Sequence, residues 1–373
     1  MTERERFLNV MEYKPVDRVP NHEAGVWAQT KERWIKEGMS EFDVQWDWFT
    51  GDEYFGMDAR EFFDVDYGMA PQFEYKLLDK TDRYEIYRDT KGIVHKALIE
   101  GTTGGMRACM DEYMSFPVET AADFKELKKR FVPNQNGRYP AGWKQIFAPR
   151  WKNRDHVLVL GRNCSMLGFY WRCREWMGTV NLSYAFYDNP SLVHEMMELI
   201  ADFTIEASKP ALRESDFDYI FINEDMSMKN GPLLSPALYK EFIWPHMRRM
   251  VDFFKSNGVK YALVDSDGNC ETLIPLLMDA GVDGIWPLER VAGMDPIRIR
   301  AEYGRDLRLW GAVDKMELAK GKDAIERHLA SLVPLIEDGG FIPTVDHTVS
   351  PDISYDNFCY YMKRKQDLLR GKF

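Results

Sequence analysis

Acidic side chains and one histidine follow apolar segments of this sequence, at places where strands are expected to end. Asp265 and Asp267 come directly after the apolar run 261–264, and a Gly268-Asn269 turn follows them. His347 comes shortly after the apolar residues 341–342. Carboxylates and an imidazole can transfer protons or hold a divalent metal such as zinc. Acids that gather in one place repel one another, so they need a metal, a cationic group or raised pKa values.

The same arrangement recurs along the second half of the chain. The apolar segments 157–160, 217–222, 284–286 and 307–310 also end in polar residues. Because the carboxyl ends of parallel strands meet at one rim of a barrel, we expect these polar side chains to converge. The polar residues at the strand ends are Arg162, Asn163, Cys164, Glu224, Asp225, Asp265, Asp267, Glu289, Asp314, Asp346 and His347.

Helical patterns separate these segments, and strands that alternate with helices indicate a parallel sheet. With a first strand at 19–27, the pattern predicts a (β/α)8 TIM barrel that forms one domain over residues 1–373. Thr2 to Met11 predicts an N-terminal helical extension with a Thr2–Glu5 capping box. Short β-rich runs predict a small inserted β meander at about 61–110, which contains a glycine-rich loop at 101–107. The expected helices are 28–60, 119–130, 190–215, 236–257, 270–280, 295–303, 316–337 and 354–370.

Each rim residue also has a purely structural interpretation. Asp267 and Asp314 could cap the helices that follow them, since aspartate is favoured at helix N-termini. Asp225 could pair with Lys229, and Glu289, beside Arg290, could lie at the surface. A lone histidine such as His347 is commonly structural, and the aromatic residues could simply fill the core.

Composition excludes several classes of function. The 373 residues carry a net charge of −11, which argues against nucleic acid and anionic membrane surfaces as partners. No run of about 18 apolar residues suggests a membrane span, and the charged N-terminus has no signal-peptide pattern. The five cysteines form no C-x-x-C pair, which favours reduced thiols and a cytoplasmic protein.

Six segments together resemble the uroporphyrinogen decarboxylase superfamily, and this resemblance covers nearly the whole chain. They are R-E-R-F-L-N-V-M-E-Y-K-P-V-D-R-V-P at 4–20, Y-F-G-M-D at 54–58, N-E-D-M-S-M-K-N-G-P-L-L-S-P at 223–236, D-S-D-G-N at 265–269, G-V-D-G-I-W-P-L-E at 281–289 and G-F-I-P-T-V-D-H-T-V-S-P-D-I-S-Y at 340–355. True decarboxylases carry an arginine-rich R-Q-A-G-R segment after the first strand, where this chain has residues 21–26, N-H-E-A-G-V. An acidic rim would also repel a porphyrinogen with many carboxylates.

The resemblance therefore implies the other branch of the superfamily, the corrinoid-dependent methyltransferases. These move a methyl group between a small molecule and the cobalt of a separate corrinoid protein. Their zinc is commonly held by an H-x-C pair and a later Cys; Asp265 and Asp267 stand at the first positions, His347 is near the last, and Glu224 falls where some members supply a carboxylate. Thiol activation is thus not expected, which leaves a carboxylate–histidine zinc site or a metal-free acid/base site.

This resemblance implies a methyl donor of the O-methyl type, for instance a methoxylated aromatic, and a corrinoid protein as the partner; the oligomeric state stays open. A decarboxylase of a small carboxylic acid and a non-catalytic ligand-binding barrel are the alternatives. The expected catalytic residues and zinc ligands are Glu224, Asp265, Asp267 and His347, and the expected substrate-binding residues are His22, Trp27, Asn223, Trp286 and Trp310.

Overall fold

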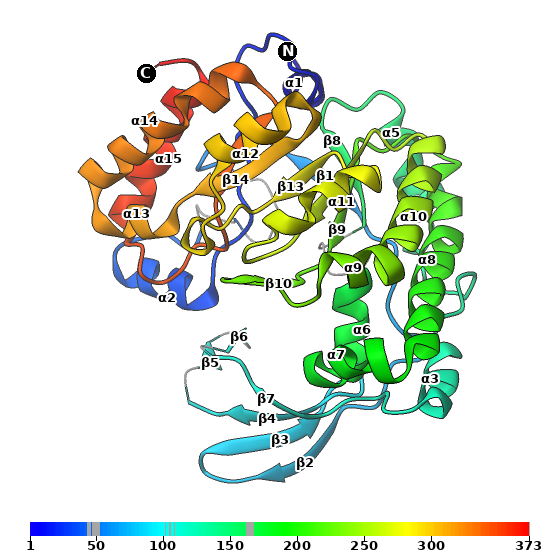
Figure 1. The fold of residues 1–373 in the computed structure, drawn as a ribbon. Helices are drawn as coiled ribbons and strands as arrows, with labels where there is room; N and C mark the ends of the chain where they lie inside the picture. Colours follow the sequence, from blue (N-terminus) through cyan, green and yellow to red (C-terminus); the bar gives the residue numbers. More distant parts are fainter. Residues whose placement is uncertain are drawn as a thin grey trace.

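A computed structural model describes residues 1–42, 46, 53–100, 102–103, 106–107, 109–161 and 168–372. Its centre is a curled parallel sheet with the strand order β1-β8-β9-β12-β13-β14-β15 (Figure 1). The strands are β1 (Arg60–Phe63), β8 (Val157–Leu160), β9 (Tyr219–Asn223), β12 (Tyr261–Asp265), β13 (Gly284–Trp286), β14 (Arg308–Val313) and β15 (Phe341–Val345). The six strands predicted between 157 and 342 are confirmed, with small shifts of their ends. Arg162, Asn163 and Cys164, predicted to follow the first of them, lie outside the described residues.

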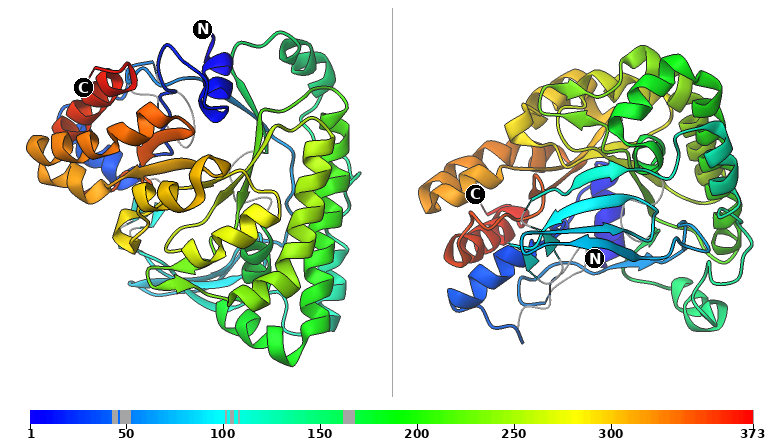
Figure 2. Two further views of the ribbon diagram at one scale, coloured as in Figure 1. Left: turned by 45° about the horizontal axis from the view of Figure 1, so that its top comes forward. Right: turned by 90° about the horizontal axis from the view of Figure 1, so that it is seen from below.

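Helices cover the outside of the sheet (Figure 2). α8 and α10 pack against one another on one side of the molecule, and α14 and α15 pack together on the other. The α-helices are α1 (Glu3–Met11), α2 (Ala28–Lys36), α3 (Ala121–Lys128), α4 (Trp143–Ile146), α5 (Ala148–Trp151), α6 (Phe169–Met177), α7 (Thr179–Asp188), α8 (Pro190–Leu212), α9 (Pro236–Leu238), α10 (Trp244–Ser256), α11 (Ile274–Asp279), α12 (Pro296–Tyr303), α13 (Lys315–Lys320), α14 (Lys322–Asp338) and α15 (Tyr355–Leu369). A π-helical turn, η2 (Tyr239–Ile243), precedes α10, and short 3-10 turns are η3 (Glu271–Leu273), η4 (Arg290–Ala292) and η5 (Gly304–Asp306).

Most of the predicted helices are present. The Thr2–Glu5 capping box of α1 is confirmed. The helical prediction for 28–60 was too long, because only 28–36 is helical among the described residues of that stretch and Arg60 opens β1. Among the described residues, no helix is long and apolar enough to cross a membrane.

The predicted first strand at 19–27 lies between β15 and β1 without forming a regular strand. Val26 makes a single parallel bridge to Val349. Two further hydrogen bonds link this segment to the chain on either side of it. The backbone N–H of Asp58, just before β1, donates to Asn21 O (2.9 Å), and the N–H of Val345 in β15 donates to the Glu23 carboxylate (2.9 Å). The described residues therefore form a curled sheet of seven strands, and the closed eight-stranded ring that the sequence predicted is not completed by a strand ladder.

The segment between β1 and β8 contains an antiparallel sheet, but its bounds differ from the prediction of about 61–110. Arg60–Phe63 is not part of it, since β1 pairs in parallel with β8. The antiparallel sheet has the order β2-β3-β4-β7, and Figures 1 and 2 show it on one side of the curled sheet, near α6 and α7. Its strands are β2 (Lys76–Lys80), β3 (Tyr84–Arg88), β4 (Val94–Leu98) and β7 (Glu112–Ser115), while β5 (Thr102–Thr103) and β6 (Met106–Arg107) pair within the glycine-rich loop, the rest of which is outside the described residues.

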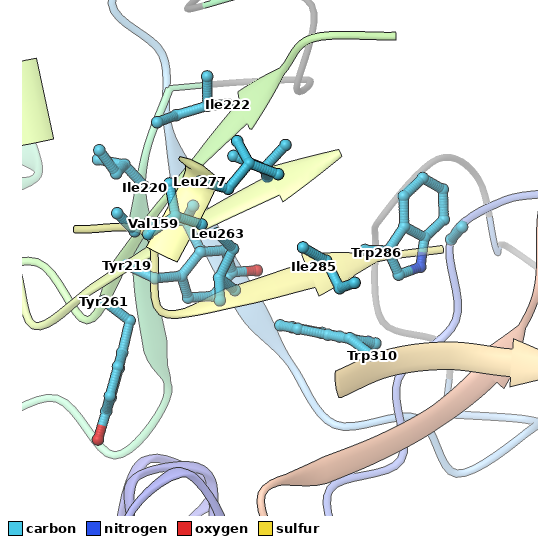
Figure 3. Close-up of a cluster of buried hydrophobic side chains, with 14 of the residues drawn as sticks. Val159, Tyr219, Ile220, Ile222, Tyr261, Leu263, Leu277, Ile285, Trp286 and Trp310 are labelled. Carbon is cyan, nitrogen blue, oxygen red and sulfur yellow. The ribbon is translucent and has the colours of Figure 1, made fainter. Parts of the chain in front are cut away.

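Large aromatic side chains occupy the inside of the curled sheet. Trp286 and Trp310 project from the neighbouring strands β13 and β14 into a cluster with aliphatic residues (Figure 3). Tyr219, Phe221 and Trp310 lie with ring centroids 5.7–6.4 Å apart. A cavity beside them measures only about 10 Å³, which is room for roughly one water molecule. This cavity does not admit a substrate-sized molecule.

Candidate functional site: an acidic rim with one histidine

Polar residues converge at one rim because the seven strands are parallel and adjacent. Each strand delivers its following residues to the same edge of the sheet, as in barrel enzymes. Acidic residues follow β9, β12, β13, β14 and β15, and His347 follows β15. The convergence predicted from the strand ends is thus present for these segments.

Three of the rim residues form a compact group. Asp267, Glu289 and His347 each offer one ligand atom, and these atoms all lie within 4.8 Å of one another. His347 Nε2 is 3.2 Å from Asp267 Oδ2. Asp267 and His347 were predicted as ligands, whereas Glu289 was counted among the converging rim residues, with a surface position as the alternative, and was not predicted as a ligand. The rule that selected Asp267 also applies to Glu289, which follows the apolar strand Gly284–Trp286 after only two residues.

Glu289 is held in place from two sides. Its Oε2 accepts the backbone N–H of Gly268 (2.8 Å), and its Oε1 accepts from Lys315 Nζ (2.8 Å). Gly268 has a φ of 73°, and a Cβ there would come within 2.7 Å of Met228 O. Only glycine allows this close backbone approach, so the Asp267–Gly268 turn brings both Asp267 and a backbone donor to Glu289.

The charges of the group favour a protonated histidine. Burial alone would lower the pKa of His347, but the hydrogen bond to Asp267 and the charge of Asp267 raise it above its ordinary value. Burial, followed by the charge of nearby Asp267, raises the pKa of Asp225. Asp225 pairs with Arg174 of α6 (3.0 Å) and not with Lys229, the partner considered from the sequence.

Glu224 and Asp265 do not belong to the group, although both were predicted as catalytic residues and ligands. The fully buried Glu224 carboxylate accepts the backbone N–H groups of Phe169 (2.9 Å) and Tyr170 (2.8 Å) at the start of α6. Burial raises the pKa of Glu224 to about 8, although these two hydrogen bonds act to lower it. Asp265 is also buried, at the end of β12, and its backbone oxygen accepts the N–H of Glu224 (2.8 Å). Of the four predicted ligands, the structure brings together only Asp267 and His347.

Two further rim acids bind backbone groups. Asp314 caps α13 by accepting the N–H of Met316 (2.8 Å), as its structural interpretation predicted. The fully buried Asp346 accepts the N–H groups of Arg290 (2.8 Å) and Lys315 (3.1 Å). Burial raises the pKa of Asp346 to about 6, even though Lys315 and these two hydrogen bonds act to lower it.

The predicted substrate-binding residues separate into two sets. Trp27 is at the rim, half-buried, with its ring 6.4 Å from that of His347 and inclined by only 21°. Asn223 ends β9, is buried, and its Oδ1 accepts no hydrogen bond from the described residues. His22, Trp286 and Trp310 lie in the interior instead: His22 stacks on Trp310 (5.3 Å), and the Trp286 indole donates to Thr344 Oγ1 (3.2 Å).

The donor set of Asp267, Glu289 and His347 fits a zinc ion. Zinc accepts carboxylate oxygen and imidazole nitrogen, and catalytic sites pair three protein ligands with one open position. Asp267 Oδ1 accepts no hydrogen bond from the described residues, so one oxygen of the group still has a lone pair available.

Comparisons with known proteins place this sequence in a family. Residues 174–367, just over half of the chain and including all three grouped residues, match the sequence model of uroporphyrinogen decarboxylase (URO-D). The uroporphyrinogen decarboxylase of Hydrogenobaculum sp. is 25% identical over 192 residues, 50% of this chain and 51% of the relative, so the chain spans about half the length of that protein. The enzyme of the same name from Hydrogenovibrio crunogenus is 25% identical over 271 residues, 68% of this chain and 70% of the relative.

A solved methyltransferase from Methanosarcina mazei shares the fold. It aligns with a TM-score of 0.57 at 12% sequence identity, over 98% of this chain and 99% of its own. The family match and the strand-end geometry agree with the resemblance seen in the sequence. The chain belongs to the uroporphyrinogen decarboxylase family.

Proposed function

We propose that the protein is a methyltransferase that moves a methyl group from a small O-methyl donor, such as a methoxylated aromatic, to the cobalt of a corrinoid carried by a partner protein. The observation that carries this proposal is the group of Asp267, Glu289 and His347 at the rim, with the half-buried Trp27 ring beside it. The fold is compatible with such a reaction, since the Methanosarcina methyltransferase shares it.

The reaction breaks the bond between the methyl carbon and the donor oxygen and forms one between carbon and cobalt. Cob(I)alamin supplies the electron pair of the new bond, and the donor oxygen keeps the pair of the old one. That oxygen leaves more easily when it is protonated or bound to a Lewis acid. A protonated His347, favoured by its contact with Asp267, could supply the proton in the absence of a metal.

In the zinc-bound form, Asp267, Glu289 and His347 would hold the ion. Zinc would supply Lewis acidity toward the donor oxygen. Lys315, which contacts Glu289 at 2.8 Å, would keep that carboxylate oriented and reduce the repulsion between the two acids. The Trp27 ring offers an apolar face next to His347, on which an aromatic donor can pack.

A decarboxylase of a small carboxylic acid is the alternative from the same family, since both aligned relatives bear the name of a decarboxylase. Such a substrate needs cations for its carboxylates. Among the described rim residues, Arg174 and Lys315 already pair with Asp225 and Glu289. Arg174 and Lys315 are therefore not available to bind the carboxylates of a substrate. This favours a substrate without carboxylates, and hence methyl transfer over decarboxylation.

The test is a methyl-transfer assay combined with zinc analysis of the purified protein. We expect about one zinc per chain, and a loss of at least roughly 100-fold in methyl transfer for Asp267→Ala and His347→Ala, because each removes a ligand. Asp123→Asn, which alters the carboxylate in the capping box of α3, is the control and should keep full activity.

Three results would contradict the proposal. Full activity of both variants with every methyl donor tested would reject the assigned residues. Release of carbon dioxide from a small acid without any corrinoid protein would establish the decarboxylase. A protein without metal and without turnover in either assay would point to a non-catalytic ligand-binding barrel.

A further inference from the structure

Asp346 joins three segments of the rim through one side chain. It follows β15 directly, and its backbone N–H donates to Val313 O of β14 (2.8 Å). Its carboxylate accepts Arg290 N, after β13, through Oδ2, and Lys315 N, after β14, through Oδ1. The side chain is fully buried, so water does not compete for these two hydrogen bonds.

The three joined segments carry the residues of the proposed metal group. Glu289 immediately precedes Arg290, and His347 immediately follows Asp346. Lys315 is linked twice, because its backbone N–H binds Asp346 and its ammonium group binds Glu289. A movement of any one segment would therefore change the separation between Glu289 and His347.

We infer that Asp346 is a positioning residue that holds Glu289 and His347 at the separation a divalent metal requires. This inference rests on the proposed metal site. Asp346 contributes no ligand of its own, since it lies outside the group whose ligand atoms gather at Asp267, Glu289 and His347. Residues behind metal ligands commonly change affinity by 10–100-fold when they are altered, because the ligands then have to be reorganised on binding.

Asp346→Asn is the direct test. Asparagine has the same shape but presents an NH₂ group to one of the two backbone donors, so one hydrogen bond is lost and one buried N–H is left without an acceptor. We expect zinc affinity, measured by competition with a chromophoric chelator, to fall by roughly 10–100-fold. Asp314→Ala removes a cap from the same helix, α13, and should change the affinity by less than about threefold.

A second pair of variants breaks the same link from the other side and leaves Asp346 intact. Arg290→Pro removes the N–H that Asp346 accepts, while Arg290→Ala keeps it and removes only the side chain. Arg290 is the first residue of η4, where proline is favoured, and the preceding Glu289 is extended (φ −58°, ψ 112°), outside the helical region that a following proline disfavours. Arg290→Pro should weaken zinc binding by a similar roughly 10–100-fold, and Arg290→Ala should not.

The outcomes separate this inference from the proposed function. Each affinity is measured at a temperature at which circular dichroism shows the variant to be folded. If the unaltered protein binds no zinc, the proposed metal site and this inference both fail. If it binds zinc and both Asp346→Asn and Arg290→Pro bind equally well, only the inference is overturned, and any loss of stability in them shows that Asp346 is merely structural.

Discussion

At the scale of single residues, the rim acids differ in what their oxygens already accept. Glu224 and Asp346 are fully buried and accept two backbone N–H groups each, whereas Asp267 Oδ1 accepts none from the described residues. The sequence could not reveal this difference, because the donors of Glu224 lie 54 and 55 residues away in the chain. The sequence predicted that these acids follow strand ends and that Asp267 and His347 share one site with Glu224 and Asp265, but not which acids remain available for chemistry.

The environment of Glu224 predicts a pH-dependent stability. Its folded-state pKa of about 8 lies above the ordinary value of 4.5, so the folded protein keeps a proton that the unfolded chain releases between these values. The contribution of Glu224 to stability therefore falls as the pH rises from about 4.5 to about 8. Glutamine does not titrate, so the Glu224→Gln variant lacks this loss of stability. Between about pH 5 and pH 8 we expect the unfolding free energy of the unaltered protein to fall, relative to that of Glu224→Gln, by on the order of 3 kcal/mol.

Urea unfolding of both proteins at the two pH values measures this change. If the difference in unfolding free energy between the two proteins is the same at both pH values, Glu224 is ionised in the folded protein. In that case the two N–H groups at the start of α6 outweigh burial, as expected of a carboxylate at a helix N-terminus.

At the scale of elements, the weakest part of the sequence prediction is the place where the ring would close. The six apolar strands between 157 and 345 were predictable because each is a short run of buried residues between turns. β1 was missed since Arg60-Glu61-Phe62-Phe63 begins with two charged residues and adjoins the β-rich segment. The segment 19–27 was predicted as a strand, but Glu23 uses its side chain to accept the N–H of Val345. The pattern of apolar and polar residues in 19–27 cannot show that the Glu23 carboxylate, and not a backbone carbonyl, accepts the N–H of Val345.

Glu23 is in turn held by α15. Its carboxylate accepts from Lys365 Nζ and Tyr361 OH, both at 2.6 Å, and Lys365 also donates to His22 O (2.7 Å). The side chains of Glu23 and Lys365 are 0% exposed. This buried pair therefore fastens the segment between β15 and β1 to the last helix.

Breaking the pair from one side should destabilise the protein strongly. Lys365→Met leaves a buried carboxylate without its cation, and we expect the unfolding free energy to fall by about 3–5 kcal/mol. Adding Glu23→Gln to this variant removes the remaining charge and should restore part of the loss. Lys36→Met, which breaks an exposed pair with Glu32 on α2, should cost less than about 1 kcal/mol. Urea unfolding measures all three; equal losses for Lys365→Met and Lys36→Met would contradict the role assigned to the buried pair.

At the scale of the whole molecule, the proposed metal group connects distant parts of the chain. Asp267 and His347 are 80 residues apart in sequence, and Glu289 lies between them, each following a different strand of the parallel sheet. The unfolded chain would have to bring these loops together to form the same site. Zinc is therefore expected to bind the folded protein far more tightly than the unfolded chain, and such a ligand stabilises the fold.

The size of this effect can be predicted. At a free zinc concentration about 100 times the dissociation constant, binding adds roughly 2.7 kcal/mol to the unfolding free energy. For a chain of 373 residues that unfolds cooperatively, this corresponds to a rise of about 3 °C in melting temperature. The rise should disappear in Asp267→Ala and His347→Ala and persist in Asp123→Asn. If zinc raised the melting temperature equally in all four proteins, it would have to bind elsewhere, and the rim would then hold a network of acids and one imidazole that acts without a metal.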